Sequence, residues 1–395
     1  MAGSTKPISL AAVNRFLLEK QHLAAGTPTP DVTRLAADIA GLHATGTTEP
    51  YLAACARLPS FERRQLDAAL FHDRTLARVR CMRGTVYILP LDLVPIAFAA
   101  LRSFYEKGSV RFLEFQGITP DVYASVTQEV LAVLRGHMLT AAEIRQAKSR
   151  DDLHFSSILN LMCDRALLLR MEPAGGWRAR NFRYGILIEC LPGIDMDRYS
   201  EDEATGLLVE RYLQAFGPAT EEDMTWWTGL AKIRVRQAVR GLGDRVTSVQ
   251  VTNLDGELLL PAAQLDTLRH VTPGGGTTVN LLPALDPYLM GYKERDRYLD
   301  DRHAPFLFDR GGNVTAAVLV NGRAAGIWDY SDSREIRFFL LEKAAKTTVR
   351  TVIRKAAEMG RFINDRDVSV RQVDRMTPLP QRTAGGFMSP LKEGK

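Results

Sequence analysis

Apolar residues recur at helical spacing through most of the N-terminal two thirds of the chain, and in three places short β-branched runs follow them. In the first place the pattern predicts helices over 8–20, 30–42, 49–57 and 60–72. Two short strands are then expected within 76–89, because β-branched and aromatic residues flank Gly84. Helices that end in a β-hairpin are the order of elements in a winged helix.

The same order of elements returns in residues 122–188. Helices are expected over 122–135, 140–148 and 155–170, with Thr140 as the cap of the middle one. Two strands are expected within 171–188, and the returning arm carries an aromatic residue among cations: Trp177, Arg178, Arg180 and Arg183. We therefore expect this hairpin to form a basic wing that contacts DNA.

A third copy is expected within 203–260. Its helices are expected over 203–216, 220–229 and 231–242, followed by strands within 246–260. The last helix interleaves apolar residues with cations that we expect to contact DNA: Lys232, Arg234 and Arg236. Three such units in tandem favour nucleic acid as the partner, although winged helices also serve as protein-interaction modules.

From residue 276 onward the pattern changes to strands, expected over 278–282, 314–320, 324–330 and 336–341. Asn321 and Gly322 predict a tight hairpin turn, because both residue types adopt positive φ. A helix is expected over 342–359, and a poorly ordered tail over 377–395. The sequence thus predicts an α+β fold with winged-helix units at 1–115, 116–195 and 196–275 and a β-rich domain at 276–395.

The 395 residues exceed one typical domain, and 46% hydrophobic with 25% charged residues are typical of a soluble globular protein. No apolar stretch is long enough to cross a bilayer, and the first ten residues lack the pattern of a secretory signal, so we expect a cytoplasmic protein without a membrane partner. The four cysteines are isolated, which predicts free, mostly buried thiols and no metal. The glycines at 274–276 lack the context of a phosphate-binding loop, so no cofactor is expected.

The net charge is +5, and basic residues gather toward the C-terminus. Residues 341–395 contain twelve lysines and arginines against six acidic residues. Such a segment can follow a phosphate backbone by releasing counterions, or it can be a solvated helix face and tail. Charge alone favours neither interpretation.

Several short motifs resemble one family over almost the whole chain, by their order and spacing: Gly41-Leu42-His43-Ala44-Thr45, Glu49-Pro50-Tyr51, Ala56-Arg57-Leu58, Arg83-Gly84-Thr85-Val86-Tyr87, Leu282-Pro283-Ala284-Leu285-Asp286-Pro287-Tyr288-Leu289, Gly291-Tyr292, Val320-Asn321-Gly322-Arg323 and Gly326-Ile327-Trp328. They are similar to the catalytic loop, first wing, β-domain and closing hairpin of the AlkZ and YcaQ DNA glycosylases. The resemblance implies three winged helices and a β-barrel-like domain that form a C-shaped, positively charged channel. It also implies action on 7-alkylpurines, interstrand crosslinks or bulky adducts, which in several relatives protects an antibiotic producer from its own genotoxin.

The family's catalytic motif is Gln, an apolar residue, then Gln or Asp, and the matching positions here hold His43, Ala44 and Thr45. Gly41 and Gly46 bracket them, which predicts an extended segment whose alternate side chains point the same way. We expect His43, which ordinarily titrates near neutrality, to accept a proton from the attacking water, and Thr45 to hold that water or to contact the sugar-phosphate. The alternative is that His43 only bonds the carbonyls of a helix C-terminus.

Four further residues are candidates for contact with DNA or with the channel. Arg83 is expected to grip a phosphate, and Arg310 lies in a turn within 306–314 that is expected to probe a groove. Asp286 and Tyr288 are expected to face the channel, with turn capping as the alternative for Asp286.

Together these features predict a monomeric, metal-free DNA glycosylase that hydrolyses the N-glycosidic bond of 7-alkylguanine or of bulky genotoxin–guanine adducts in double-stranded DNA. An alkylated guanine is already a cation and leaves without a protein acid, so the site mainly needs an oriented water. Two alternatives stay open: a non-catalytic winged-helix regulator that binds DNA, and a protein that sequesters a small genotoxin.

Overall fold

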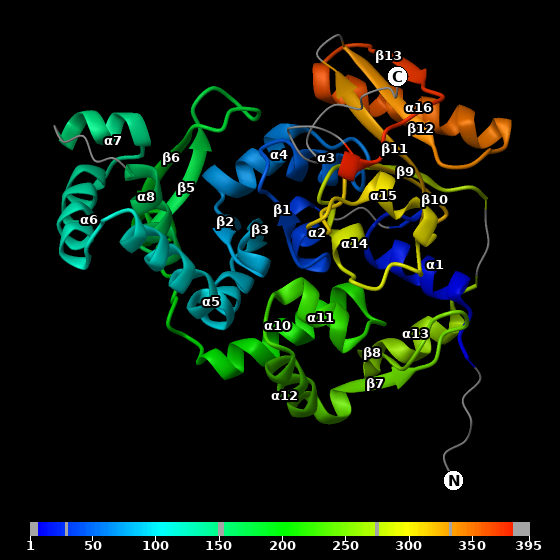
Figure 1. Cartoon of the computed structure of the whole chain (residues 1–395), viewed down its shortest axis with the longest axis horizontal. Helices are drawn as coiled ribbons and strands as arrows, with labels where there is room; N and C mark the ends of the chain where they lie inside the picture. The colour runs from blue at the N-terminus through cyan, green and yellow to red at the C-terminus, as the bar shows by residue number, and fades with distance from the viewer. Residues whose placement is uncertain (1–6, 28–30, 149–153, 273–275, 332–333, 382–395) are drawn as a thin grey trace.

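Residues 7–27, 31–148, 154–272, 276–331 and 334–381 are described by the computed structural model, which has a mixed α+β fold (Figure 1). The expected tail beyond residue 381 and the glycines at 274 and 275 lie outside these ranges. The described elements form three segments that share one order of helices and strands, and then a sheet covered by a helix.

The first segment contains a three-stranded sheet in the order β1-β3-β2. Its elements are α1 (Leu10–Lys20), α2 (Val32–Asp38), β1 (Leu42–His43), α3 (Glu49–Cys55), α4 (Arg63–Asp67), η1 (Ala68–His72), β2 (Leu76–Arg80), η2 (Met82–Gly84) and β3 (Val86–Pro90). The helix expected over 30–42 ends earlier, because Ala40 and Gly41 adopt positive φ and Leu42 then pairs with Ile88.

The second segment follows the long helix α5 (Leu93–Phe115) and has the strand order β4-β6-β5. Its elements are α6 (Pro120–Leu134), β4 (Leu139–Thr140), α7 (Ala141–Lys148), α8 (Phe155–Asp164), β5 (Leu168–Pro173) and β6 (Phe182–Ile186). The α8 helix is shorter than expected, because Ala166 has positive φ and β5 begins two residues later. Thr140 caps α7 as expected, since its hydroxyl accepts a 3.3 Å hydrogen bond from the Glu143 amide.

The third segment repeats this plan after α9 (Leu187–Cys190). Its elements are α10 (Glu201–Phe216), α11 (Glu221–Thr228), α12 (Lys232–Leu242), η3 (Gly243–Arg245), β7 (Val246–Val249), β8 (Leu258–Pro261), η4 (Ala262–Gln264) and α13 (Leu265–His270). Ala219 forms a β-bridge with Leu259, at the position that β1 and β4 occupy in the other segments. Ser200 with Glu203 forms the capping box that starts α10.

The C-terminal sheet has five strands in the order β13-β12-β11-β10-β9, antiparallel except for the parallel pair β12 and β13. The elements of this region are β9 (Val279–Leu282), α14 (Pro287–Met290), η5 (Asp301–His303), α15 (Ala304–Leu307), β10 (Ala317–Val320), β11 (Arg323–Ser331), β12 (Glu335–Leu340), α16 (Lys346–Asn364), β13 (Ser369–Gln372) and η6 (Leu379–Gln381). Asn321 and Gly322 have φ values of 51° and 77°, which confirms the tight turn between β10 and β11.

The expectation of a barrel-like C-terminal domain is wrong. In the part of the chain that the structure describes, this sheet stays open, and its edge strands β9 and β13 do not pair. Helix α16 packs against the sheet through Val352, Ala356 and Met359, so the apolar face is buried without closure of the strands. Figure 1 shows β12, β13 and α16 together at the upper right, in orange and red.

One large apolar core crosses the limits between the segments. Leu17 of α1, Leu101 of α5, Leu213 of α10 and Leu289 of α14 all belong to it. Helices from the first and third segments and from the C-terminal region therefore share one interior, which fixes their relative positions around the site described next.

Candidate active site

Strand β1 holds the residues around His43 in an extended conformation beside β3. The close approach depends on Gly41, which has φ of 106° and where an added Cβ would lie 2.5 Å from the Leu89 side chain. The pairing continues at Ala44, whose amide donates a 2.7 Å hydrogen bond to the Val86 carbonyl. The expected extended segment is thus confirmed, and the alternative of a helix C-terminus at His43 is wrong.

The His43 imidazole is buried against the ring of Tyr87. Only 4% of the residue is exposed, and the two ring centroids lie 4.8 Å apart in an edge-on arrangement. Its Nδ1 atom is buried and has no hydrogen-bond partner among the described residues. Burial, with a smaller contribution from the charge of Arg83, lowers the pKa of His43 to about 3. The expected titration near neutrality is therefore wrong, and the ring is neutral and weakly basic at pH 7.

Thr45 lies two residues further along and, unlike His43, is exposed. Its hydroxyl accepts a 3.4 Å hydrogen bond from the Val86 amide at the end of the strand pairing. On the other side of the loop, the buried Arg78 donates a 3.1 Å hydrogen bond to the Ala44 carbonyl. The loop is thus anchored to β2 and β3, while the Thr45 side chain stays accessible.

The carboxyl group of Glu49, from the Glu49-Pro50-Tyr51 motif, packs against the same loop. Glu49, at the start of α3, is 6% exposed, and its carboxylate lies over Gly46, where an added Cβ would overlap it. Burial raises the pKa of Glu49, opposed by hydrogen bonds from Thr48 and by the charge of Arg180. A glycine at position 46 is therefore required for this packing.

Arg83 brings distant parts of the chain to the same place. Its guanidinium carbon lies 3.7 Å from the centre of the Trp226 ring in α11, and it donates a 3.4 Å hydrogen bond to the Gly311 carbonyl. Tyr87, which packs on the imidazole, lies edge-on to Trp227, with 6.5 Å between ring centroids. The β2–β3 hairpin, the turn around Gly311 and the histidine are thus neighbours. Sequence reasoning missed both tryptophans, because no local signal separates them from core aromatics.

The turn around Gly311 is the one expected to probe DNA. A β-bridge between Phe308 and Val314 closes it, and Arg310 is exposed on it. The turn is confirmed, while the contact of Arg310 with DNA stays a prediction.

Asp286 and Tyr288 do not face a channel, which corrects the expectation for both. The Asp286 carboxylate accepts two 2.7 Å hydrogen bonds from the Arg57 guanidinium, and neither side chain is exposed. It also accepts a 3.0 Å hydrogen bond from the Tyr288 amide, so the alternative of turn capping, at α14, is confirmed. The buried Tyr288 hydroxyl donates to the Gly322 carbonyl at 3.0 Å. Both side chains are held in the interior because buried polar groups need partners.

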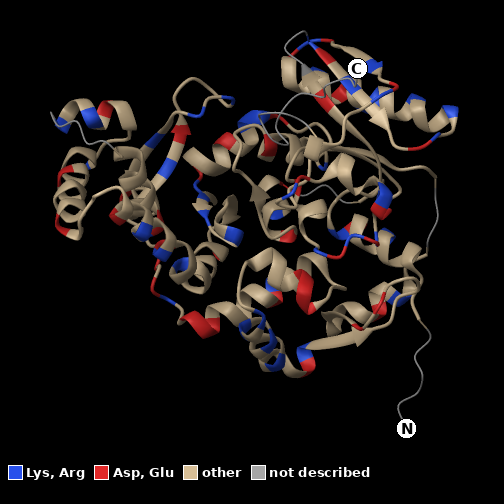
Figure 2. Cartoon of the chain, viewed as in Figure 1, with Lys and Arg blue, Asp and Glu red and all other residues tan. Residues whose placement is uncertain are grey.

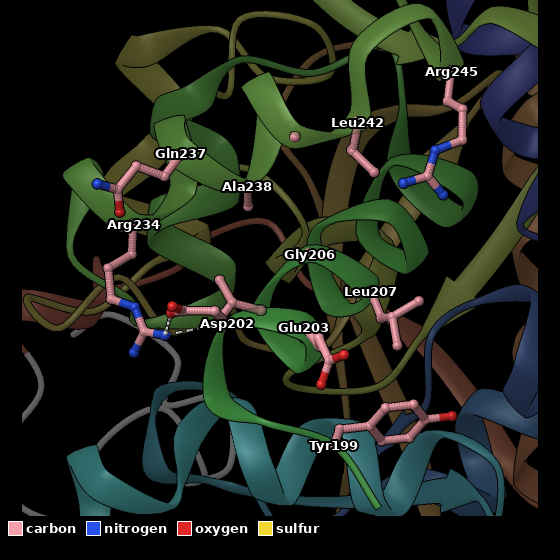
Figure 3. Close-up of a pocket in the computed structure, with 12 residues that line it drawn as sticks. Tyr199, Asp202, Glu203, Gly206, Leu207, Arg234, Gln237, Ala238, Leu242 and Arg245 are labelled. Atoms are coloured by element: carbon pink, nitrogen blue, oxygen red, sulfur yellow. Dashed lines mark hydrogen bonds and ion pairs between the residues drawn. The ribbon is translucent and has the colours of Figure 1, made fainter.

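The cations of α12 form ion pairs with acidic residues of α10 and α11: Lys232 with Glu222, Arg234 with Asp202 at 3.1 Å, and Arg236 with Glu221 at 2.8 Å. Figure 2 shows the blue α12 beside the red N-terminal end of α10. In Figure 3, Arg234 points at Asp202 beside a pocket of about 590 Å³ between the two helices. Contact of these cations with DNA stays a prediction, in which a phosphate would compete with the carboxylates.

The cations of the β5–β6 hairpin have different partners. Arg178 donates a hydrogen bond to the Ile363 carbonyl of α16, and Arg183 pairs with Glu143 at 3.1 Å. Arg180 is exposed. Their expected contacts with DNA also stay a prediction.

Among the described residues, no three His, Cys, Asp or Glu side chains lie close enough to hold a metal ion. All four cysteines are free thiols, of which Cys81 and Cys190 are buried. Within the same ranges, no helix combines the length and apolar character needed to span a bilayer.

The family profile described as DNA glycosylase AlkZ-like matches residues 36–362. This range includes β1, the β2–β3 hairpin with Arg83, and the turn around Gly311. The chain belongs to the AlkZ-like DNA glycosylase family. It is thus an enzyme of DNA repair that cleaves the bond between a base and its sugar.

Two relatives of this AlkZ-like chain come from Streptomyces sahachiroi. A protein described as an interstrand DNA cross-link repair glycosylase is 27% identical over 301 residues, which span 73% of this chain and 79% of the relative. The solved structure of the DNA glycosylase AlkZ matches with a TM-score of 0.77 and 22% identity, and the match covers 93% of this chain and 100% of that one. At this identity, the structural likeness establishes the shared α+β fold.

Proposed function

We propose that this AlkZ-like glycosylase, as a monomer, hydrolyses the N-glycosidic bond of 7-alkylguanine or of a bulky genotoxin–guanine adduct in double-stranded DNA. The observation that carries the proposal is the convergence of His43, Arg83 and the turn around Gly311 at one place in the fold. The three segments would act as winged helices that hold the duplex in a C-shaped, positively charged channel. Repair of such adducts would also give resistance to the genotoxin.

A neutral imidazole suits this reaction. Guanine alkylated at N7 leaves as a neutral base, and the transition state is a sugar with oxocarbenium character. An imidazolium beside that sugar would repel the developing positive charge. The low pKa of His43 keeps the ring uncharged and avoids this repulsion.

In the proposed mechanism, His43 and Thr45 orient the attacking water without removing its proton. With a pKa of about 3, His43 is too weak a base for efficient proton transfer at pH 7. A neutral ring nitrogen still makes a hydrogen bond, and since Nδ1 is buried, the contact with the water would be made by Nε2. The exposed Thr45 hydroxyl supplies a second contact. Orientation of a reactant can by itself lower a barrier by several kcal/mol.

The direct test is release of free base from a duplex that carries a single 7-methylguanine, measured by chromatography. The variant His43→Ala is expected to lower the single-turnover rate by at least about 10²-fold, with duplex binding retained. Thr45→Ala is expected to lower it less, because one of the two contacts remains. The matched control is His270→Ala, at an exposed histidine of α13, which should leave the rate unchanged.

The same assay should also use duplexes with bulky monoadducts and crosslinked duplexes, because one relative is described as an interstrand DNA cross-link repair glycosylase. If the protein binds duplex DNA but releases base from none of these substrates, base excision is rejected. Such a result would favour the non-catalytic regulator.

The pH dependence tests the neutral imidazole separately. Base release from 7-methylguanine should be independent of pH from about 5 to 8, because a group with pKa near 3 does not titrate there. A rate that rises with a midpoint near the ordinary histidine value of 6.5 would show base catalysis instead.

A further inference from the structure

Arg83, which lies near His43, and its neighbour Arg295 have no acidic ion-pair partner among the described residues. Arg83 and Arg295 each donate one hydrogen bond in those ranges, to the carbonyls of Gly311 at 3.4 Å and Gly312 at 3.3 Å. Both distances are at the long end for hydrogen bonds, so these contacts are weak. Because a guanidinium has five N–H donors, most of the donors on both groups are unused.

Both guanidinium groups are held by aromatic rings. The Arg83 guanidinium carbon lies 3.7 Å from the centre of the Trp226 ring, and that of Arg295 lies 3.6 Å from the centre of the Phe308 ring. Stacking fixes the plane of a guanidinium and leaves its N–H edges available for an oxyanion. These two arginines are therefore positioned without the help of a carboxylate.

The two positive charges are close enough to interact. Burial lowers the pKa of Arg83, and the charge of Arg295 lowers it further, although Tyr87 and Asp309 act in the opposite direction. The Asp309 carboxylate is itself occupied by the amide and the side chain of Asn313, at 2.9 and 3.0 Å. In addition, Arg295 Nε is buried without a partner in the described part of the chain. Two neighbouring cations without an acidic partner, one of them with an N–H donor that lacks an acceptor, form a site that favours an anion.

The glycine turn packs directly beside these two arginines. At Gly312, φ is 74°, and an added Cβ would lie 2.7 Å from the Trp226 ring and 3.0 Å from the Arg295 guanidinium. The turn can approach both groups only because this residue has no side chain. Gly311 beside it is exposed, and Arg83 and Arg295 are both partly exposed, so an anion can approach the turn from solvent.

We propose that Arg83 and Arg295 together clamp one phosphate of the DNA backbone beside His43, on the turn formed by Gly311 and Gly312. The identity of the polymer rests on the proposed function, whereas the sharing of one phosphate by two arginines rests on the geometry. The bound phosphate is an anion next to the reacting nucleotide, so it would also favour the positive charge that develops on the sugar.

The test measures binding of undamaged duplex DNA by fluorescence anisotropy over a series of salt concentrations. Each phosphate contact contributes about 0.9 to the slope of log K against log salt. Either guanidinium can neutralise the shared phosphate alone, so Arg83→Gln and Arg295→Gln are each expected to weaken binding several-fold with little change in slope. The double variant is expected to reduce the slope by about 0.9. Arg295→Lys should retain most of the slope, because the charge remains, while binding weakens several-fold with the loss of the planar fork.

The matched control is Arg198→Gln. Arg198 stacks on Tyr199 at 5.2 Å and has no ion pair among the described residues, as the two clamp arginines do, but it is more exposed and lies elsewhere. Its slope and its affinity should equal those of the parent protein. Equal thermal midpoints for all variants would show that the changes are not losses of folding.

Two results would overturn the clamp. A slope loss of about 1.8 in the double variant would mean two separate phosphates. An unchanged slope and affinity in the double variant would mean that the arginines only pack on their rings. Because undamaged DNA is used, failure of the clamp is distinguishable from failure of base excision: slopes that change as expected without any base release would keep the clamp and reject the enzyme mechanism.

Discussion

His43 shows, at the scale of a single residue, how burial changes the free energy of protonation. The unfolded chain binds a proton at this histidine below about pH 6.5, whereas the folded chain does so only near pH 3. Between these values the unfolded state holds more protons than the folded state, so stability falls as the pH falls. Above pH 6.5 the residue is neutral in both states, so it no longer changes the free energy of unfolding with pH.

The variant His43→Gln removes this titration. From pH 7 to pH 5, the parent protein is expected to lose about 2 kcal/mol more of its free energy of unfolding than the variant, at about 1.4 kcal/mol per pH unit below the unfolded pKa. Urea unfolding at the two pH values measures the difference. His270→Gln, at an exposed histidine, should behave as the parent does. Equal losses in His43→Gln and the parent would refute the burial of an uncharged ring.

At the scale of elements, a buried ion pair joins α3 to α14. Arg57 follows α3 and also donates to the Gln21 and Ala53 carbonyls, at 3.0 and 3.1 Å. Its guanidinium forms the two 2.7 Å hydrogen bonds with Asp286, the N-cap of α14. Since both side chains are fully buried, the pair orients α14 relative to α3, the helix that begins at Glu49 beside the His43 loop.

Breaking this pair should be costly. Asp286→Asn leaves the Arg57 charge buried without its counter-charge, and the expected loss of unfolding free energy is about 3–5 kcal/mol. The control is Glu358→Gln, which breaks the exposed pair with Arg354 on α16 and should cost at most about 0.5 kcal/mol. Denaturant unfolding of both variants checks the contrast. Similar small losses in the two variants would show that the buried charge is not confined as the structure indicates.

At the scale of the whole molecule, the loop between β5 and β6 connects the second segment to α16. The Trp177 ring lies 5.4 Å from Tyr51 and 6.2 Å from Phe362, centroid to centroid, and the Arg63 guanidinium stacks on it at 5.0 Å. Arg63 also pairs with Asp365 just beyond α16 at 2.5 Å. Three regions far apart in the sequence thus meet at one junction.

Trp177→Ala should loosen this junction. Loss of the stacked contacts is expected to speed amide hydrogen exchange in the loop at 174–181 by about tenfold, which corresponds to about 1.4 kcal/mol of lost local stability. Exchange in α10 should not change. The control is Phe115→Ala on α5, where the ring is 85% exposed and makes little contact to lose. Unchanged exchange at 174–181 would mean that the loop is held by its backbone alone.

The sequence by itself determined the local elements and their order. Capping residues such as Ser200 and Thr140 start helices, and Asn321 with Gly322 turns a hairpin, because these signals act through backbone φ and nearby hydrogen bonds. The repeated helix-and-hairpin plan and the extended segment at His43 follow from the same signals. The pattern does not indicate α5, since its exposed phenylalanines, Phe104, Phe112 and Phe115, interrupt the amphipathic period.

Only the tertiary structure decided which residues form the site and in which charge state. The pKa of His43 depends on burial and on Arg83, forty positions away in the chain, and Asp286 is taken into the interior by Arg57, 229 positions away. Trp226 of the third segment and Arg295 of the C-terminal region reach Arg83 only through the packing of these parts on the first segment. Burial and charge partners are set by residues distant in sequence, and no local pattern carries that information.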